Sequence, residues 1–182
     1  MLYDEPGFKE VHDTYRPKLL RYLAGLVGEQ EAEDLTQEVF IRVSRGLKDF
    51  RGESQLSTWI YRIATNAAID RIRASARGSA EQISLSESDE TIEVDGWTGE
   101  ETPSLEQLLM RKEMYECFLD YVKHLPMNYR TVVLLSELGE FSNNDIAGIL
   151  GLSLDTVKIR LHRGRLKLFQ ELKSRCKAED WL

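Results

Sequence analysis

A basic segment near the end of the chain, DTVKIRLHRGRLKL from Asp155 to Leu168, has residue types suited to binding a polyanion. It holds five Lys or Arg residues and one acid, although the whole chain of 182 residues carries a net charge of -7. Guanidinium and ammonium groups bind phosphate, and both also hydrogen-bond to guanine in the major groove of DNA. A solvated basic helix face is the alternative interpretation. The segment therefore raises the hypothesis of a nucleic-acid contact without establishing it.

The residues before and within this segment have the spacing of a helix-turn-helix. Ala147, Gly151 and Val157 fit the small residue, the turn glycine and the β-branched packing residue of that motif. On a helical wheel, the apolar stripe that faces inward consists of Val157, Leu161, Gly164 and Leu168. The outward face then consists of Asp155, Lys158, Ile159, His162 and Arg163, with Arg160 and Lys167 at its flanks. An exposed Ile159 among basic residues favours base reading in the major groove over a merely solvated face.

A second set of candidate groups lies in the acidic stretch EAEDLTQE. Glu31, Asp34 and Glu38 can share one face of a helix, as the carboxylates of a metal site would. The three histidines and two cysteines of the chain are scattered in the sequence, and none joins these acids to complete a metal site or a nucleophile relay. We therefore expect no metal, no cofactor and no enzymatic activity, and we expect both cysteines to be reduced.

Composition and charge indicate a globular chain with two folded parts. No apolar run approaches the roughly 20 residues of a membrane span, and the first residues lack the features of a secretion signal, so we expect a cytoplasmic protein. The stretch 81–120 carries a net charge of -10. The overlapping stretch 78–104 is rich in Ser, Glu, Asp and Gly and has no helical apolar period, which indicates a flexible acidic linker. The sequence thus predicts domains over 1–77 and 105–182.

The N-terminal part is predicted to be helical throughout. A first helix over 8–26 contains Pro17, which is expected to kink or split it, and ends at Gly28. The second helix buries a stripe made of Leu35, Val39, Val43 and Leu47. The third begins near Ser57 and carries Trp59 on its apolar stripe, which favours core packing for this side chain.

The C-terminal part is predicted to be helical as well. A helix over 105–125 precedes one over 129–138, and Gly139 fits a left-handed cap after it. The residues that bound the last two helices are also predicted from their types: Ser142 and Asp145 as a capping box, Gly151 at the turn and Ser153 as the final cap. No strand pattern is present, so the expected fold class is all-α: two small helical domains joined by an acidic linker, the second with a helix-turn-helix.

Three blocks of the sequence together resemble a known family. The blocks are EAEDLTQEVFIRV over 31–43, FRGESQLSTWIYRIATNAAID over 50–70 and FSNNDIAGILGLSLDTVKIRLHRGRLKL over 141–168. They are similar to the signature blocks of bacterial extracytoplasmic-function (ECF) sigma factors, in the family's order and over nearly the whole chain. The resemblance implies that the first block docks on the clamp helices of the RNA polymerase β′ subunit. It implies that the second recognises and melts the minus-ten promoter element, that the third binds the minus-thirty-five element, and that the linker enters the polymerase cleft.

The resemblance also implies roles for single residues. The polymerase-contact face would be Asp34, Gln37, Glu38 and Ile41. The minus-ten contacts would be the loop of Arg51, Gly52, Glu53, Ser54 and Gln55, with Arg62, Asn66, Arg71 and Arg73. In this set, the loop and Asn66 match positions that hold a flipped base. The minus-thirty-five contacts would be Asp155, Thr156, Lys158, Ile159, Arg160, His162, Arg163, Arg165 and Lys167. The implied partners are core RNA polymerase with its β′ and β subunits, promoter DNA and an anti-sigma factor.

Two other functions compete with this one. A stand-alone helix-turn-helix regulator would explain the third block only, and failure to bind core polymerase would favour it. A hydrolase built on the acids of EAEDLTQE would be favoured by hydrolytic activity of the purified protein with added metal. The promoter sequence itself is not carried over, because the family often has Gly, Ser or Ala where this chain has Asp155, Ile159 and Gly164.

Overall fold

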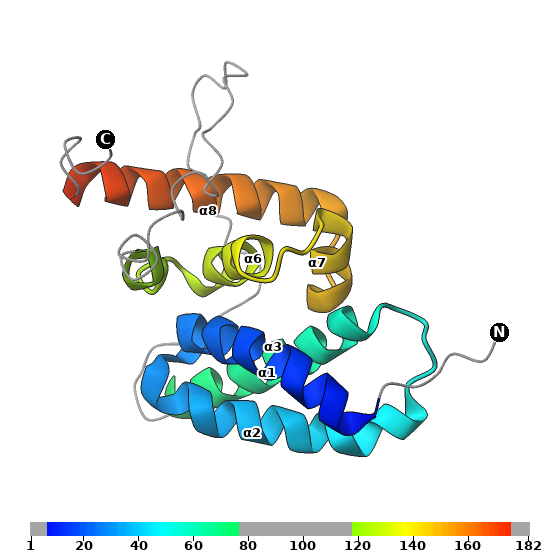
Figure 1. The fold of residues 1–182 in the computed structure, drawn as a ribbon. Helices are drawn as coiled ribbons and strands as arrows, with labels where there is room; N and C mark the ends of the chain where they lie inside the picture. Colours follow the sequence, from blue (N-terminus) through cyan, green and yellow to red (C-terminus); the bar gives the residue numbers. More distant parts are fainter. Residues whose placement is uncertain (1–6, 77–117, 176–182) are drawn as a thin grey trace.

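The computed structural model describes residues 7–76 and 118–175, with side chains as far as residue 171. Its elements are α1 (Phe8–Val27), α2 (Glu29–Gly46), a 3-10 turn (Leu47–Asp49), α3 (Leu56–Ala76), α6 (Met127–Glu137), α7 (Asn143–Leu150) and α8 (Leu154–Arg175) (Figure 1). A helical run over 118–122 precedes α6. All regular structure in the described ranges is helical, so the all-α fold class is confirmed there. The predicted linker over 78–104 and most of the helix predicted over 105–125 lie outside them.

Helices α1, α2 and α3 pack together as one layer (Figure 1). The predicted stripe of α2 is confirmed for Leu35, Val39 and Val43, which are fully buried or nearly so, whereas Leu47 falls in the 3-10 turn and is half-buried. The hydroxyl of Tyr22 from α1 lies 2.8 Å from Thr65 Oγ1 of α3, so these two buried hydroxyls are paired across the layer. Packing of apolar stripes thus fixes how α2 and α3 present their outer faces.

Of the two effects expected of Pro17, the splitting of the first helix is wrong. Helix α1 runs without interruption from Phe8 to Val27 with Pro17 inside it, and it ends at Gly28, whose φ is 88°. A proline removes one backbone donor from a helix. Val11 before Pro17 and Leu19 after it are both buried, so the two halves of α1 pack against the same core. This packing compensates for the lost hydrogen bond.

Gly139 does not adopt the predicted left-handed conformation. The residue with positive φ at this turn is Glu140, at 55°. A Cβ atom on Gly139 would lie 2.7 Å from the carbonyl oxygen of Leu135 and would also meet the ring of Phe141. Glycine is therefore needed at 139 for lack of space, because Phe141 folds back over the end of α6. The strained left-handed conformation falls on Glu140 instead.

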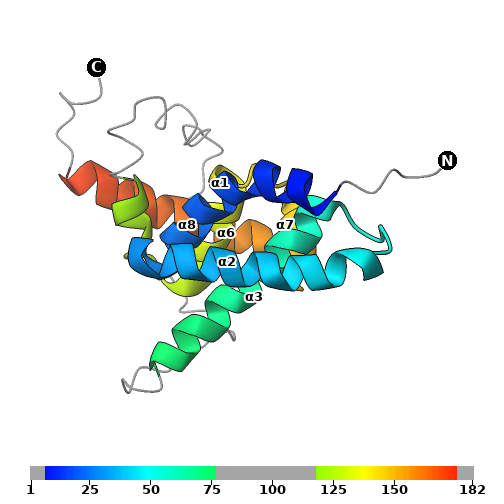
Figure 2. The same ribbon diagram turned by 60° about the horizontal axis from the view of Figure 1, so that its bottom comes forward.

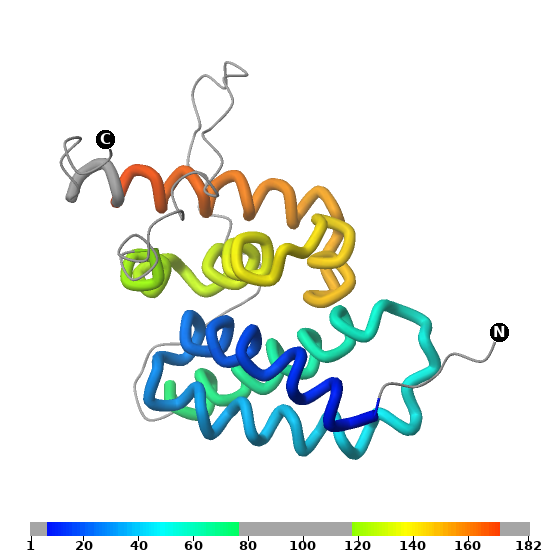
Figure 3. The backbone as a smooth tube through the Cα atoms, viewed as in Figure 1, coloured from blue at the N-terminus to red at the C-terminus, as the bar shows by residue number. Residues whose placement is uncertain are grey.

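Helices α6, α7 and α8 form the second layer. Ser142 and Asp145 make the predicted capping box at the start of α7, Gly151 has φ 66° at its end, and Thr156 N–H donates to Ser153 Oγ over 3.2 Å. The backbone N–H of Leu152 donates to the carbonyl of Ala147 over 3.1 Å. These predictions are confirmed, and together they set the turn that directs α8 away from α7 (Figure 3).

The two layers pack on each other through α1 against α6 and α3 against α7 (Figures 1 and 3). Leu134 fills the space above Gly25, and the rings of Tyr61 and Phe141 meet edge-on at 4.7 Å. Arg130 donates to the carbonyl of Leu26 across the interface at 3.3 Å, and burial lowers the pKa of this guanidinium. The described residues therefore share one continuous apolar core.

Gly164 provides a test of the packing of α8 on α6. A Cβ at this position would lie 2.8 Å from Val133 Cγ2 and 3.3 Å from Tyr129 Cβ, whereas a Cβ on Gly148 would meet nothing closer than 3.8 Å. We expect Gly164→Ala to lower the free energy of unfolding by about 1–3 kcal/mol through overpacking. Gly148→Ala should raise it by up to about 1 kcal/mol, because alanine is the better helix former. Urea denaturation compares the two, and equal midpoints would show that α8 is not held this tightly.

Candidate functional site

Helix α8 presents the first part of the predicted outward face to solvent. Its inward stripe is buried, with Val157 and Leu168 fully so, and this confirms the orientation of the helix. The opposite side, in the first two turns after the Ser153 cap, carries exposed Asp155, Lys158 and Ile159. Thr156 and Arg160 are half-buried between the two sides. The first turns of the second helix are the part of a helix-turn-helix that meets base edges.

The remaining basic side chains of this segment are partly engaged inside the protein. Arg165 donates to the Glu137 carboxylate at 2.6 Å and to Ser136 Oγ at 3.1 Å, and the Glu137 side chain is only 8% exposed. Lys167 Nζ lies 6.0 Å from the centre of the Tyr129 ring. His162 and Arg163 are half-buried and also hold interactions. The basic residues thus divide into an exposed start of α8 and a later part that ties α8 to α6, which helical periodicity alone did not reveal.

Helix α2 presents a mixed polar and apolar face. Asp34, Gln37 and Ile41 are exposed, and Ile41 is 52% exposed although it is a large apolar residue. Leu35 and Phe40 are buried as predicted. The predicted face of Asp34, Gln37, Glu38 and Ile41 therefore forms a continuous strip on the outside of the helix. These side chains point outward because the buried stripe of α2 packs against the core on the opposite side.

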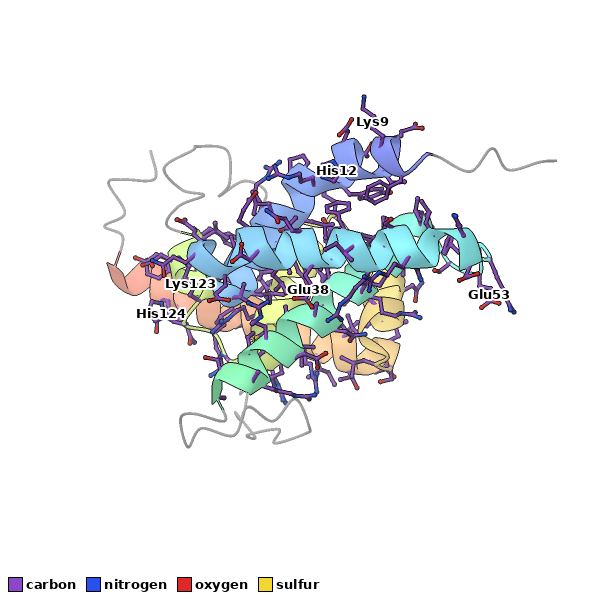
Figure 4. All side chains as sticks on the ribbon, turned by 90° about the horizontal axis from the view of Figure 1, so that it is seen from below. Lys9, His12, Glu38, Glu53, Lys123 and His124 are labelled. Atoms are coloured by element: carbon purple, nitrogen blue, oxygen red, sulfur yellow. The ribbon has the colours of Figure 1, made fainter. Side chains whose placement is uncertain are left out.

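Glu38, at the edge of this strip, is held by two arginines. Its carboxylate accepts from Arg42 Nη2 at 2.5 Å and from Arg71 Nη2 at 3.0 Å, and Arg71 Nη1 also donates to Glu31 at 2.7 Å. The hydrogen bond from Arg42, and then that from Arg71, lowers the pKa of Glu38, while the bond to Glu31 raises the pKa of Arg71. Figure 4 shows Glu38 between α2 and α3. Arg71, predicted as a DNA contact, is thus engaged with the acids of α2.

The loop before α3 and the helix itself carry the other predicted DNA residues. Arg51, Gly52, Glu53 and Gln55 are exposed, Ser54 is half-buried, and Gly52 has φ 69°. Glu53 lies at the outer tip of this loop (Figure 4). Asn66 and Arg73 are exposed on α3, whose C-terminal part projects past the other helices (Figure 2). Within the described residues no hydrogen bond joins Asn66 to the loop, and it lies ten residues after Leu56, roughly 15 Å along the axis.

Trp59 is half-buried and packs against its neighbours. Its ring lies 5.2 Å from the ring of Phe50, and it closes so tightly over Gly46 that a Cβ there would be 3.0 Å from its edge. Its contacts place it against the apolar core, as its position on the helical stripe predicted.

Comparison with known proteins gives this arrangement a family. Residues 11–78 match the family Sigma-70 region 2, and residues 115–168 match Sigma-70, region 4. The chain is 33% identical over 180 residues to the ECF RNA polymerase sigma factor SigW of Bacillus subtilis, covering 93% of this chain and 91% of SigW. It is 32% identical over 162 residues to the ECF RNA polymerase sigma-E factor of Haemophilus influenzae, covering 89% and 85% of the two chains. The chain belongs to the ECF sigma factor family.

Solved structures share the fold, among them that of the sigma factor RpoE. RpoE from Bartonella quintana, determined with the anti-sigma factor NepR, has a TM-score of 0.68 and 21% identity over 93% of this chain and 98% of RpoE. CnrH, determined with the cytosolic domain of CnrY, has a TM-score of 0.63 and 20% identity over 96% and 92%. As an ECF sigma factor, the protein is a promoter-recognising subunit of RNA polymerase. None of its described helices is long and apolar enough to cross a membrane.

In this sigma factor, the region 2 match covers almost all of α1 and the whole of α2 and α3, and the region 4 match contains α6, α7 and the first part of α8. One predicted minus-ten residue lies at the contact between them. Arg62 Nη2 of α3 donates to the carbonyl of Gly148 in α7 at 2.6 Å. The other N–H groups of this guanidinium face solvent, because the Arg62 side chain is exposed. In the packed arrangement, the arginine thus bridges the two matched regions.

Proposed function

We propose that the sigma factor binds core RNA polymerase and the two promoter elements with three separate surfaces of the described helices. The exposed strip of α2 binds core RNA polymerase, and the loop over 51–55 with the outer side of α3 holds the minus-ten element. The start of α8 enters the major groove at the minus-thirty-five element. The observation that carries the proposal is the orientation of α8: a buried stripe on one side places Asp155, Lys158 and Ile159 together on the exposed side.

In vitro transcription tests the proposal as a whole. Purified protein is added to core polymerase with fragmented genomic DNA, and the start sites of the transcripts are sequenced. We expect transcripts that begin at a fixed distance from two shared sequence elements and that are absent with core polymerase alone. Specific DNA binding without any polymerase-dependent transcript would favour a stand-alone helix-turn-helix regulator.

The proposed minus-ten contact predicts a strand-opening defect for Asn66→Ala. Extruding a base from the duplex costs a few kcal/mol, which polar contacts to the flipped base must offset. Asn66 is exposed on α3 and can reach such a base. We expect the loss of this one hydrogen-bonding side chain to reduce opening of a duplex promoter roughly 10-fold. Permanganate footprinting measures opening, and a pre-melted template should be affected much less. Ser75→Ala, also exposed on α3, is the control, and equal losses on both templates would contradict a role in melting.

The proposed function also requires the two layers to separate. By their names, the two promoter elements lie about 25 base pairs apart, which is roughly 85 Å at 3.4 Å per base pair. Helix α8 has 22 residues, a length of about 33 Å, and α7 at its start lies directly against α3. Since the packed protein cannot reach both elements, the contacts of Arg62, Arg130 and Tyr61 across the interface belong to a polymerase-free state.

We also propose an anti-sigma factor as a partner, with action in the cytoplasm and no catalytic centre. The support is that RpoE was determined with the anti-sigma factor NepR. Co-purification of a tagged copy from its own cells tests this, with loss of transcription on adding the captured protein as the expected result.

A further inference from the structure

Ile159 is a large apolar side chain displayed on a charged face. It is 48% exposed, and the other large apolar side chains exposed among the described residues are Phe8, Ile41 and Phe169. At helical spacing, its neighbours on the outer side of α8 are Asp155, Lys158, His162 and Arg163. The buried stripe of α8 lies opposite, so Ile159 contributes nothing to the core.

The charged residues around Ile159 suit contact with one small apolar group better than contact with an apolar protein surface. Apolar docking surfaces on proteins extend over a few hundred square ångströms, whereas this apolar side chain has an acid, Asp155, one turn before it and a base, Arg163, one turn after it. The face has the charged groups that meet phosphates and base edges. In a DNA major groove the one apolar group of a base is the 5-methyl group of thymine.

We propose that Ile159 is a specificity-determining residue that contacts the 5-methyl group of a thymine in the minus-thirty-five element. The inference rests on the proposed function, because it needs α8 in the major groove. Ile159 lies on the second turn of α8, within the part of a recognition helix that reaches base edges. Asp155 is one turn earlier on the same face, where a carboxylate can accept from the amino group of cytosine. Lys158 beside them supplies a contact to phosphate or guanine and so holds the helix in register.

Removal of single methyl groups from the DNA tests the contact. The probe is a promoter fragment obtained by transcription with the holoenzyme, in which each thymine of the minus-thirty-five element is replaced in turn by deoxyuridine. With the wild-type holoenzyme, we expect deoxyuridine at one or two positions to weaken binding about 3- to 5-fold, the effect of one apolar group. With Ile159→Ala the same replacements should have no effect, and Ile159→Val should retain part of it.

Phe169→Ala is the matched control, because Phe169 is an exposed apolar residue of the same helix, 42% exposed and ten residues further on. It should leave the deoxyuridine effect unchanged. The inference is overturned if no thymine position responds, if the response persists in Ile159→Ala, or if Ile159→Ala weakens only binding to polymerase or another protein. A holoenzyme that does not prefer the promoter fragment to a shuffled one would instead refute the proposed function, on which the inference depends.

Discussion

A disulfide that ties the two helical layers together is expected to abolish promoter-directed transcription, and its reduction is expected to restore it. The position is given by Gly148, where a Cβ atom would lie 3.8 Å from Thr58 Cγ2. Because Cγ2 of Thr58 and the sulfur of a cysteine at 58 are both bonded to Cβ, the pair Thr58→Cys and Gly148→Cys brings two sulfur-bearing side chains side by side across the interface. The hydroxyl of Thr58 is buried without a hydrogen-bond partner, so replacing it costs little.

The reason for the expected loss is the distance between the promoter elements, which the packed layers cannot span. In the experiment the native cysteines, Cys117 and Cys176, are replaced by serine, so that the introduced pair is the one that can form. A non-reducing gel confirms the cross-link, and transcription from a promoter fragment is compared before and after reduction. Each single variant, treated with the same oxidant, serves as the control. Full transcription by the cross-linked protein would show that the packed arrangement is itself active.

Reversal of one charge on α2 is expected to give the second large effect. Asp34 is exposed at the N-terminal end of the strip proposed to bind core polymerase, and Asp34→Lys places a positive charge where the partner accommodates a negative one. We expect the dissociation constant for core polymerase to rise roughly 10- to 100-fold. Titration of labelled sigma factor with core polymerase measures it, and circular dichroism checks that the helix content is unchanged.

Glu29→Lys is the control for this prediction. It makes the same change of net charge at an exposed position of α2 on a different side of the helix. Glu38→Lys would be a poorer test, because it also breaks the bonds to Arg42 and Arg71. Equal weakening by Asp34→Lys and Glu29→Lys would indicate a general electrostatic effect, and unchanged binding by Asp34→Lys would place the polymerase contact elsewhere.

Several features of the fold and of the candidate site could be predicted from the sequence because they depend on near neighbours in the chain. The stripe from Val157 to Leu168 determined which side of α8 is buried, and so which side is displayed. The capping box of Ser142 and Asp145 and the turn at Gly151 depend on residues three or four apart. Helical periodicity and side-chain capping are local properties, so residue types at known spacing are sufficient to predict them.

The pairing of charged groups was decided by the tertiary structure. Arg62 bonds to Gly148, 86 positions later, Arg71 bonds to Glu38, 33 positions earlier, and Arg165 bonds to Glu137, 28 positions earlier. Each of these arginines was assigned to DNA because the resemblance implies a DNA contact at its position. A helical wheel shows which way a side chain points, but the partner it meets depends on the path of the whole chain. The packing of α3 on α7, of α3 on α2 and of α8 on α6 brings those partners within bonding distance, and no local pattern encodes it.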